Sequence, residues 1–501
     1  MINTPRLAGI LLHISSLPNR YGIGSLGQCA YRWVDYLRDC KIGLWQVLPL
    51  VPTSYGDSPY QSPCSTAYNQ YFIDLDMLIQ QGLLTNQDVD IDWGSDSTRV
   101  DYKKLYDNRY LCLRKAFDNY TATTQYEQFI ASNRYYDYAL FMTIKQSFNG
   151  LEWRKWDEPL RNRESSAVVN FCNRNAREIE FWQWTQYIFM QQWTALKRYA
   201  NANNVRIIGD MPIYVAYDSV EVWSNPQMFL LDKVGNPTVV AGCPPDCYSQ
   251  EGQLWGNPLF DWQYMKNNNY VWWNNRIDDA LKLFDYVRID HFRGFCQYYA
   301  IPYGNNDAKQ GEWIDGCGFD LFADKLDKNI IVEDLGFIDD NVRQLVSKTG
   351  YPSMRVLEFA FNGDTDNEHN PTNIPSNCIA YTGTHDNMPL YQFVQDLAAL
   401  EYDNLIKQLA IQCKTFDVEC ILTDARTIVD TIINLLFASR ANFVVVPLQD
   451  ILCQGVASRM NLPSTLSMNN WSYRTQWQQL SSQLHERIIN LVVTTNRAPK
   501  P

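Results

Sequence analysis

Short apolar runs rich in β-branched residues recur along this chain, and each ends in polar residues or in glycine or proline. Continuous hydrophobicity, rather than alternation, is typical of parallel strands that are buried on both faces. Helical patterns fill most of the intervals, for example 29–41 and 427–440. We therefore predict an α/β fold, a (β/α)8 TIM barrel. The predicted strands are 7–13, 43–49, 205–210, 284–290, 329–333, 355–361, 378–384 and 442–447.

Two intervals are too long for one crossover helix. Residues 65–204, between strands 2 and 3, carry large apolar side chains at helical spacing, such as Trp182, Phe189 and Trp193. They predict a mainly helical insertion whose aromatics pack a core, with further helical patterns over 100–120 and 126–148. Residues 219–275, between strands 3 and 4, predict a loop-rich insertion. Loops that follow strands lie on the C-terminal face, so we expect a single catalytic barrel over 1–501 with inserted subdomains on that face.

Ionisable residues follow several predicted strands directly. They are His13, Asp210, Asp290 with His291, Glu333 with Asp334, and His385 with Asp386. In a barrel these positions converge on one face. Three of the chain's five histidines belong to this set, which favours a functional site over scattered core histidines.

The densest stretch is the octet 287–294, VRIDHFRG. In an extended strand Arg288 and Asp290 share one face. The guanidinium would lower the pKa of the carboxyl, which suits a nucleophile. A purely structural ion pair explains the octet equally well.

Carboxylates on such a face, without a cluster of metal-ligand histidines, fit glycoside chemistry. Asp290 is the natural nucleophile. Glu333 follows an apolar run, where burial would raise its pKa and suit a general acid and base. Asp386 would be a third carboxylate for ring hydroxyls and transition-state charge. Each acid alone could instead cap a helix or loop, but three at strand ends make that reading less favourable.

Composition narrows the function further. A net charge of −12 without a basic stripe argues against nucleic acid as a partner. No apolar segment approaches the roughly 20 residues of a membrane span, so no membrane association is expected. The thirteen cysteines, mostly isolated, indicate reduced thiols and a cytoplasmic location. Aromatic residues reach 14%, which suits sugar platforms as well as cores. Residues 494–501 are expected to fray.

A glycine motif offers a competing hypothesis. Residues 22–27, GIGSLG, match the dinucleotide-binding pattern G-x-G-x-x-G. A proline-containing spacer precedes them where a tight turn is required, and strand 2 lacks the ribose-binding acid. We therefore interpret these glycines as loop residues.

The ordered motifs along nearly the whole chain resemble the amylomaltase, or disproportionating-enzyme, family of 4-α-glucanotransferases, glycoside hydrolase family 77. Together these motifs are far more specific than any one alone. The matching segments are GILLH at 9–13, SLP at 16–18, YGIG at 21–24, GDSPY at 56–60, SP at 62–63, GDMPIYV at 209–215, PPD at 244–246, GQLWGNP at 252–258, RIDHFRG at 288–294, EDLG at 333–336 and GTHDN at 383–387.

The resemblance implies a retaining transfer of α-1,4-glucan segments to glucose or maltooligosaccharides. Asp290 would be the nucleophile, Glu333 the acid and base, and Asp386 the transition-state stabiliser. It implies no metal and no cofactor, and a cytoplasmic or plastid-stromal enzyme that is a monomer or homodimer. The implied sugar-binding residues are Ser58, Tyr60, Tyr102, Asp210, Trp255, Asn257, Arg288, His291, His385 and Asn461.

Three departures from the family pattern affect the surroundings of the site. After Asn387 this chain has Met388-Pro389-Leu390, where the family more usually has an acidic residue followed by two threonines. Ser464 replaces the glycine of the family's Pro-Gly-Thr motif. Cys243 and Cys247 occupy positions that are more often apolar or aromatic, in a loop, 243–252, that the resemblance places over the cleft. None of these departures touches the three carboxylates. A hydrolase that uses water as acceptor, or a glucan-binding protein without activity, stays an alternative.

Overall fold

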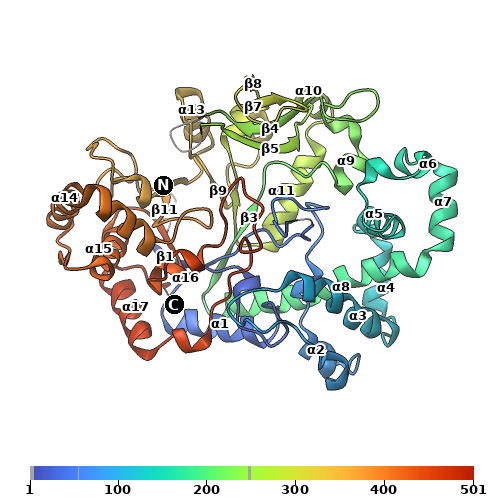
Figure 1. Cartoon of the computed structure of the whole chain (residues 1–501), viewed down its shortest axis with the longest axis horizontal. Helices are drawn as coiled ribbons and strands as arrows, with labels where there is room; N and C mark the ends of the chain where they lie inside the picture. The colour runs from blue at the N-terminus through green and yellow to red at the C-terminus, as the bar shows by residue number, and fades with distance from the viewer. Residues whose placement is uncertain (1–4, 55, 246–249, 501) are drawn as a thin grey trace.

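The protein, seen in a computed structural model that describes residues 5–54, 56–245 and 250–500, is built around an eight-stranded parallel sheet (Figure 1). Its hydrogen-bonded order is β10-β11-β12-β1-β2-β3-β6-β9. Its strands are β1 (Leu7–Leu11), β2 (Leu44–Gln46), β3 (Arg206–Met211), β6 (Tyr286–Ile289), β9 (Ile330–Val332), β10 (Ser353–Val356), β11 (Cys378–Tyr381) and β12 (Phe443–Pro447).

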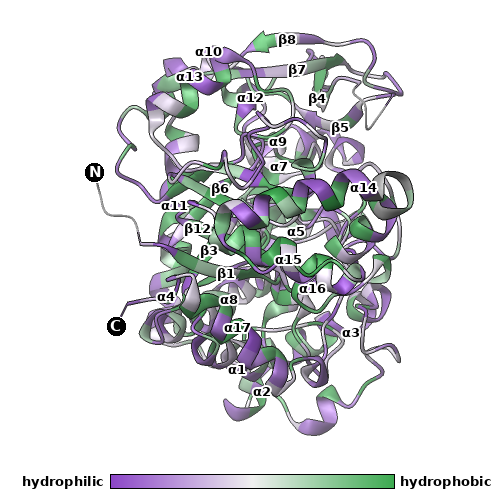
Figure 2. Cartoon of the chain, turned by 90° about the vertical axis from the view of Figure 1, so that its left-hand side faces the viewer, coloured by the Kyte–Doolittle hydropathy of each residue, from purple (hydrophilic) through white to green (hydrophobic). Residues whose placement is uncertain are grey.

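The two end strands of this sheet meet. Val332, in β9, donates its N–H to the carbonyl of Pro352, just before β10, at 3.0 Å. The sheet therefore nearly closes into a barrel, and the predicted (β/α)8 fold is confirmed. The strands are buried almost throughout, as continuous apolar runs require (Figure 2).

One predicted strand is partly wrong. The apolar run 355–361 predicts a strand, but β10 ends at Val356 and a 3-10 helix, Leu357–Phe359, follows. The N–H of Ala360 closes this turn on the carbonyl of Leu357 at 2.9 Å. An apolar run reports burial and cannot distinguish a strand from a buried turn.

Helices surround the barrel and form most of the first insertion. One predicted helical segment, 126–148, is split into α4 and α5, because Asn133 adopts a left-handed backbone with φ 54°. The helices are α1 (Gln28–Asp39), α2 (Leu75–Gln80), α3 (Tyr102–Asp118), α4 (Thr124–Ala131), α5 (Tyr136–Ser147), α6 (Glu158–Arg161), α7 (Ser165–Arg174), α8 (Ala176–Ala202), α9 (Val220–Ser224), α10 (Trp262–Asn267), α11 (Val271–Leu283), α12 (Arg293–Cys296), α13 (Asp340–Thr349), α14 (Leu390–Phe416), α15 (Ala425–Ala438), α16 (Leu448–Ile451) and α17 (Ser482–Thr494).

The chain between β2 and β3 carries α2 to α8, and α3 to α8 lie to one side of the barrel, on the right in Figure 1. The long helix α8 leads back into β3. Its large aromatic residues Trp182, Phe189 and Trp193 are buried, so their predicted core role is confirmed.

A second, antiparallel sheet stands above the barrel in Figure 1. Its order is β5-β4-β7-β8, from β4 (Val239–Cys243), β5 (Gln253–Pro258), β7 (Gln297–Pro302) and β8 (Glu312–Asp315). Two of its strands lie in the interval 219–275 and two follow β6. The exact boundaries of the inserted subdomains stay a prediction.

The glycine-rich loop 22–27 packs against protein atoms. A Cβ at Gly24 would lie 1.8 Å from the carbonyl oxygen of Ile14, and one at Gly27 would lie 2.1 Å from the carboxylate of Asp74. Close packing therefore accounts for both glycines, and the Asp74 carboxylate lies where a phosphate would meet the start of α1.

The C-terminal segment is anchored rather than frayed. Arg497 is fully buried, and its guanidinium donates to the carbonyls of Phe437, Ser439 and Ala441. The N–H of Ala8, in β1, bonds to the Arg497 carbonyl. The prediction of fraying over 494–501 is thus wrong at Arg497. Among the described residues, none of the helices is both long and apolar enough to cross a membrane.

Candidate active site

The C-terminal ends of neighbouring barrel strands bring the predicted carboxylates together. Asp210 lies in β3, in register with Arg288 of β6. Asp290 directly follows β6, and its N–H bonds to the carbonyl of Met211 at 3.1 Å. Glu333 directly follows β9, and its N–H bonds to the carbonyl of Ile289 at 3.1 Å. The strand ladder thereby fixes the backbone of both acids.

Arg288 is the centre of this cluster. One guanidinium nitrogen, Nη1, lies 2.6 Å from each oxygen of Asp210. The other, Nη2, lies 2.6 Å from Glu333 Oε2 and 3.1 Å from Asp290 Oδ1. The arginine side chain is only 5% exposed, so these charged contacts are shielded from water. The predicted pairing of Arg288 with Asp290 exists, but the arginine is shared among three carboxylates.

The pKa shifts of the two central acids are the reverse of the predicted ones. Burial, followed by the negative charge of Glu333, raises the pKa of Asp290 well above its usual value. Burial also opposes ionisation of Glu333, but the nearby charge of Arg288 and the N–H of His291 lower its pKa to about 2. Each acid thus affects the ionisation of the other, and Glu333 ionises more readily than Asp290.

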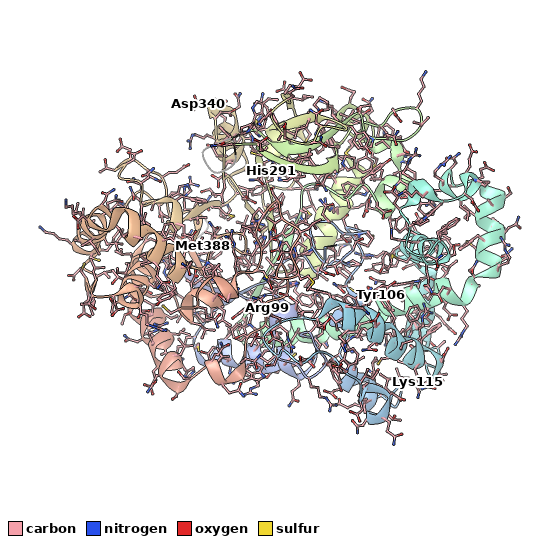
Figure 3. The ribbon with its side chains drawn as sticks, viewed as in Figure 1. Arg99, Tyr106, Lys115, His291, Asp340 and Met388 are labelled. Atoms are coloured by element: carbon pink, nitrogen blue, oxygen red, sulfur yellow. The ribbon has the colours of Figure 1, made fainter. Side chains whose placement is uncertain are left out.

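His291 lies beneath the antiparallel sheet, next to Trp255 of β5 (Figure 3). Its backbone is left-handed, with φ 46°, which turns its N–H toward Glu333 Oε2 at 3.0 Å. The imidazole meets the ring of Trp255, in β5, edge to face at 4.8 Å between centroids. Burial lowers its pKa to about 4, so the ring is neutral at neutral pH. Its Nε2 is buried and has no hydrogen-bond partner among the described residues.

Asp386 enters the site from the turn between β11 and α14. Its Oδ1 accepts a hydrogen bond from Asn461 Nδ2 at 2.6 Å and lies 3.4 Å from His385 Nε2. Its side chain is 44% exposed, whereas that of His385 is 6% exposed. The carboxylate of Asp386 is therefore held from one side and open on the other.

Tyr60 connects the two halves of the site. Its hydroxyl donates to Asp210 Oδ2 at 2.6 Å, and its ring stacks on His385 with centroids 5.2 Å apart and planes 4° apart. Trp471 packs against both rings. Sequence reasoning missed Trp471, because a single tryptophan in a polar stretch carries no distinguishing pattern.

Three predicted sugar-binding residues are held by protein contacts. Ser58 Oγ accepts the N–H of Tyr60 at 3.2 Å, and the Tyr102 hydroxyl donates to the carbonyl of Trp471 at 2.8 Å. Asn257 donates to the carbonyl of Val215 at 2.9 Å. These contacts give each residue a structural task, and their sugar-binding role stays a prediction.

Two strand-end residues serve the structure instead. His13 Nδ1 accepts the N–H of Leu48 at 3.2 Å, and burial lowers the pKa of this histidine to about 3. Asp334 pairs with Arg355 at 3.0 Å. The remaining strand-end residues surround Arg288 and Asp386. Cys243 ends β4, but Cys247 and the middle of the predicted covering loop lie outside the described residues.

The chain is similar to known proteins over nearly its whole length. Residues 12–480 match the glycoside hydrolase family 77 model, described as 4-alpha-glucanotransferase. The chain belongs to this family. A 4-alpha-glucanotransferase from Streptococcus pneumoniae is 42% identical over 503 residues, which cover 98% of this chain and 97% of the relative. A chloroplastic/amyloplastic 4-alpha-glucanotransferase from Solanum tuberosum is 38% identical over 489 residues, which cover 94% and 82%.

The fold agrees with this membership. The structure of an amylomaltase from Streptococcus agalactiae in complex with acarbose superimposes with a TM-score of 0.92 at 37% identity, covering 98% of this chain and 100% of the other. The protein is thus a glycosyl-transferring enzyme of the 4-alpha-glucanotransferase family, and the predicted resemblance is confirmed.

Proposed function

We propose that the enzyme moves segments of α-1,4-glucans to glucose or maltooligosaccharide acceptors by a retaining double displacement. Asp290 is the nucleophile, Glu333 the acid and base, and Asp386 the group that stabilises the transition state. The shared contact of Asp290 and Glu333 with one atom, Arg288 Nη2, carries this proposal.

That contact limits the distance between the two acids. Their nearest oxygens cannot be farther apart than the two contacts of 3.1 and 2.6 Å laid end to end. This limit is below the roughly 6.5–9.5 Å that separates the carboxyl groups of inverting enzymes, which must seat a water between them, so it favours retention.

The first step requires one proton on the pair. That proton must reside on Glu333 when the sugar is bound, so that Asp290 is ionised. Asp290, now ionised, attacks the anomeric carbon, while Glu333 gives the proton to the departing glycosidic oxygen. In the second step Glu333 takes a proton from an acceptor hydroxyl, whose oxygen displaces Asp290. The first step moves one proton from Glu333 to the leaving group, and the second returns one proton from the acceptor to Glu333. The protons therefore balance over the cycle.

The choice of acceptor rests on the family. Water and a sugar hydroxyl present the same oxygen to Glu333, and the carboxylate spacing is the same for both. The relatives from Streptococcus pneumoniae and Solanum tuberosum are named for glucanotransfer, which favours a sugar as acceptor. The amylomaltase from Streptococcus agalactiae binds acarbose, and we propose that this site takes a similar oligosaccharide.

Incubation with maltotriose tests the proposal. Transfer yields glucose and longer oligomers while the number of reducing ends stays constant, whereas hydrolysis raises that number. Asp290→Asn should abolish both reactions. Asp334→Asn is the matched control, because this neighbouring acid pairs with Arg355 outside the cluster. Full activity of Asp290→Asn would contradict the nucleophile assignment, and binding without any product would indicate a glucan-binding protein.

We also infer that the enzyme works in a reducing compartment, the cytosol or a plastid stroma, as a monomer or homodimer. Cys29, Cys40 and Cys64 are buried free thiols, which suits such a compartment. Recovery of the native protein in a secreted fraction would contradict this location, and light scattering would measure the oligomer.

A further inference from the structure

The turn 382–390, between β11 and α14, presents Asp386 to the site. A small cavity lies against Thr384, His385, Asn387, Met388 and Pro389, of which Met388 is labelled in Figure 3. Van der Waals contacts across a void are lost. Hydrogen bonds therefore help to fix the position of this turn.

Asp450, in α16, ties the two ends of the turn. Its carboxylate accepts the hydroxyl of Thr382 at 2.6 Å and the N–H of Leu390 at 2.7 Å. Asp450 is buried, with 2% of its surface exposed. The turn thus begins and ends on one buried side chain.

Glu358, in the 3-10 helix after β10, ties the middle. Its Oε2 accepts a hydrogen bond from Asn387 Nδ2 at 3.0 Å. Asn387 Oδ1 in turn accepts the N–H and the hydroxyl of Thr384 at 2.9 and 2.8 Å. Glu358 thus holds Asn387 directly and Thr384 through Asn387. These two residues flank His385 and Asp386 in the sequence.

Glu358 lies directly against the turn. A Cβ at Gly383 would be only 2.6 Å from Glu358 Oε1. That oxygen is buried and has no hydrogen-bond partner among the described residues. Burial, followed by the charge of Asp450, raises the pKa of Glu358 well above its usual value. A glutamine has the same shape, the same acceptor oxygen and no charge.

We propose that Glu358 is a positioning residue for glucan transfer, which acts through Asn387 to hold the turn 382–390 and with it the carboxylate of Asp386. The inference rests on the proposed function of Asp386. It differs from a catalytic role, because Glu358 touches the turn and not the shared carboxylates of Asp290 and Glu333.

Two substitutions separate positioning from proton transfer, with maltotriose disproportionation as the assay. Glu358→Gln should keep kcat within about threefold of the parent. Glu358→Ala should lower kcat by about 10²-fold, the typical cost of a displacement near 1 Å, and change KM much less. Equal losses in both variants would mean that the proton of Glu358 is required, which would overturn positioning. An unchanged kcat in Glu358→Ala would overturn it as well.

A double-mutant cycle tests the route through Asp386. In an Asp386→Asn background, Glu358→Ala should lower kcat further by less than about threefold, because the group that Glu358 positions has already been altered. Independent, multiplying losses would overturn the proposal. If Asp386→Asn alone retains full activity, the proposed function of Asp386 fails instead, so the two failures are distinguishable.

The control is Asp74→Ala. Asp74 is also a buried acid, and it caps the distant helix α2 by accepting the N–H of Met77 at 2.9 Å. Its loss should reduce thermal stability with kcat unchanged. If Glu358→Ala does not fold, Asn387→Ala removes the same link from the other end and should show the same loss of kcat. An unchanged kcat in folded Asn387→Ala would overturn the proposal.

Discussion

Replacing Arg288 by methionine is the sharpest test of the electrostatics of this site. The substitution keeps a side chain of similar length and removes the charge that Asp210, Asp290 and Glu333 share. Removing one partner of a buried ion pair is costly, because the remaining charges stay buried without compensation.

The pKa of Glu333 sets the scale. It is about 2 in the folded protein, against an ordinary value of 4.5. At about 1.4 kcal/mol per pKa unit, the ionised glutamate contributes about 3 kcal/mol to the free energy of unfolding at pH 7. Because the folded-state pKa is depressed, this contribution is complete above the ordinary value and is lost as pH falls toward 2. Arg288 is the largest of the causes that lower this pKa, so we expect Arg288→Met to lose much of this free energy at neutral pH.

Urea unfolding at a series of pH values measures the effect. The difference in the free energy of unfolding between parent and variant should become smaller below about pH 4.5, since the parent loses the contribution of ionised Glu333 there. Transfer from maltotriose should fall by about 10²-fold or more, because the two acids are no longer held together. A variant within about 1 kcal/mol of the parent at pH 7 would refute the reasoning. Arg355→Met is the matched control, because Arg355 bridges Asp334 and Glu368 away from the cluster, and its loss should spare kcat.

Two further substitutions probe single contacts. Tyr60→Phe removes the hydroxyl that donates to Asp210 but keeps the ring on His385, so urea unfolding should show a loss of about 1.5–3 kcal/mol, typical of a hydrogen bond to a charged group; no measurable loss would mean that this bond adds nothing. Asn461→Ala frees Asp386 Oδ1, and steady-state kinetics should show kcat lower by about tenfold, as expected for about 1.4 kcal/mol. An unchanged kcat would show that Asp386 is held adequately by the turn alone.

Local details of the fold were beyond the reach of sequence patterns. Hydropathy marks burial, and seven of the eight barrel strands lie within or overlap closely with predicted apolar runs, whereas β10 shares only residues 355 and 356 with its run. The 3-10 helix at Leu357–Phe359 is equally apolar, so it was predicted as strand. Arg497 lies in a polar terminal stretch, and only the carbonyls it meets from α15 and the following loop explain its burial.

The sequence by itself determined the barrel and the identity of the acids at its strand ends, because both depend on local order along the chain. Only the tertiary structure decided how charge is distributed among them. Alternation along β6 places Arg288 beside Asp290, but the neighbouring strands β3 and β9 bring Asp210 and Glu333 to the same guanidinium. The directions of both pKa shifts follow from burial and from those contacts between strands. Glu358 is a visible acid within an apolar run of the sequence. Its hydrogen bond to Asn387, 29 positions further along the chain, depends on the fold.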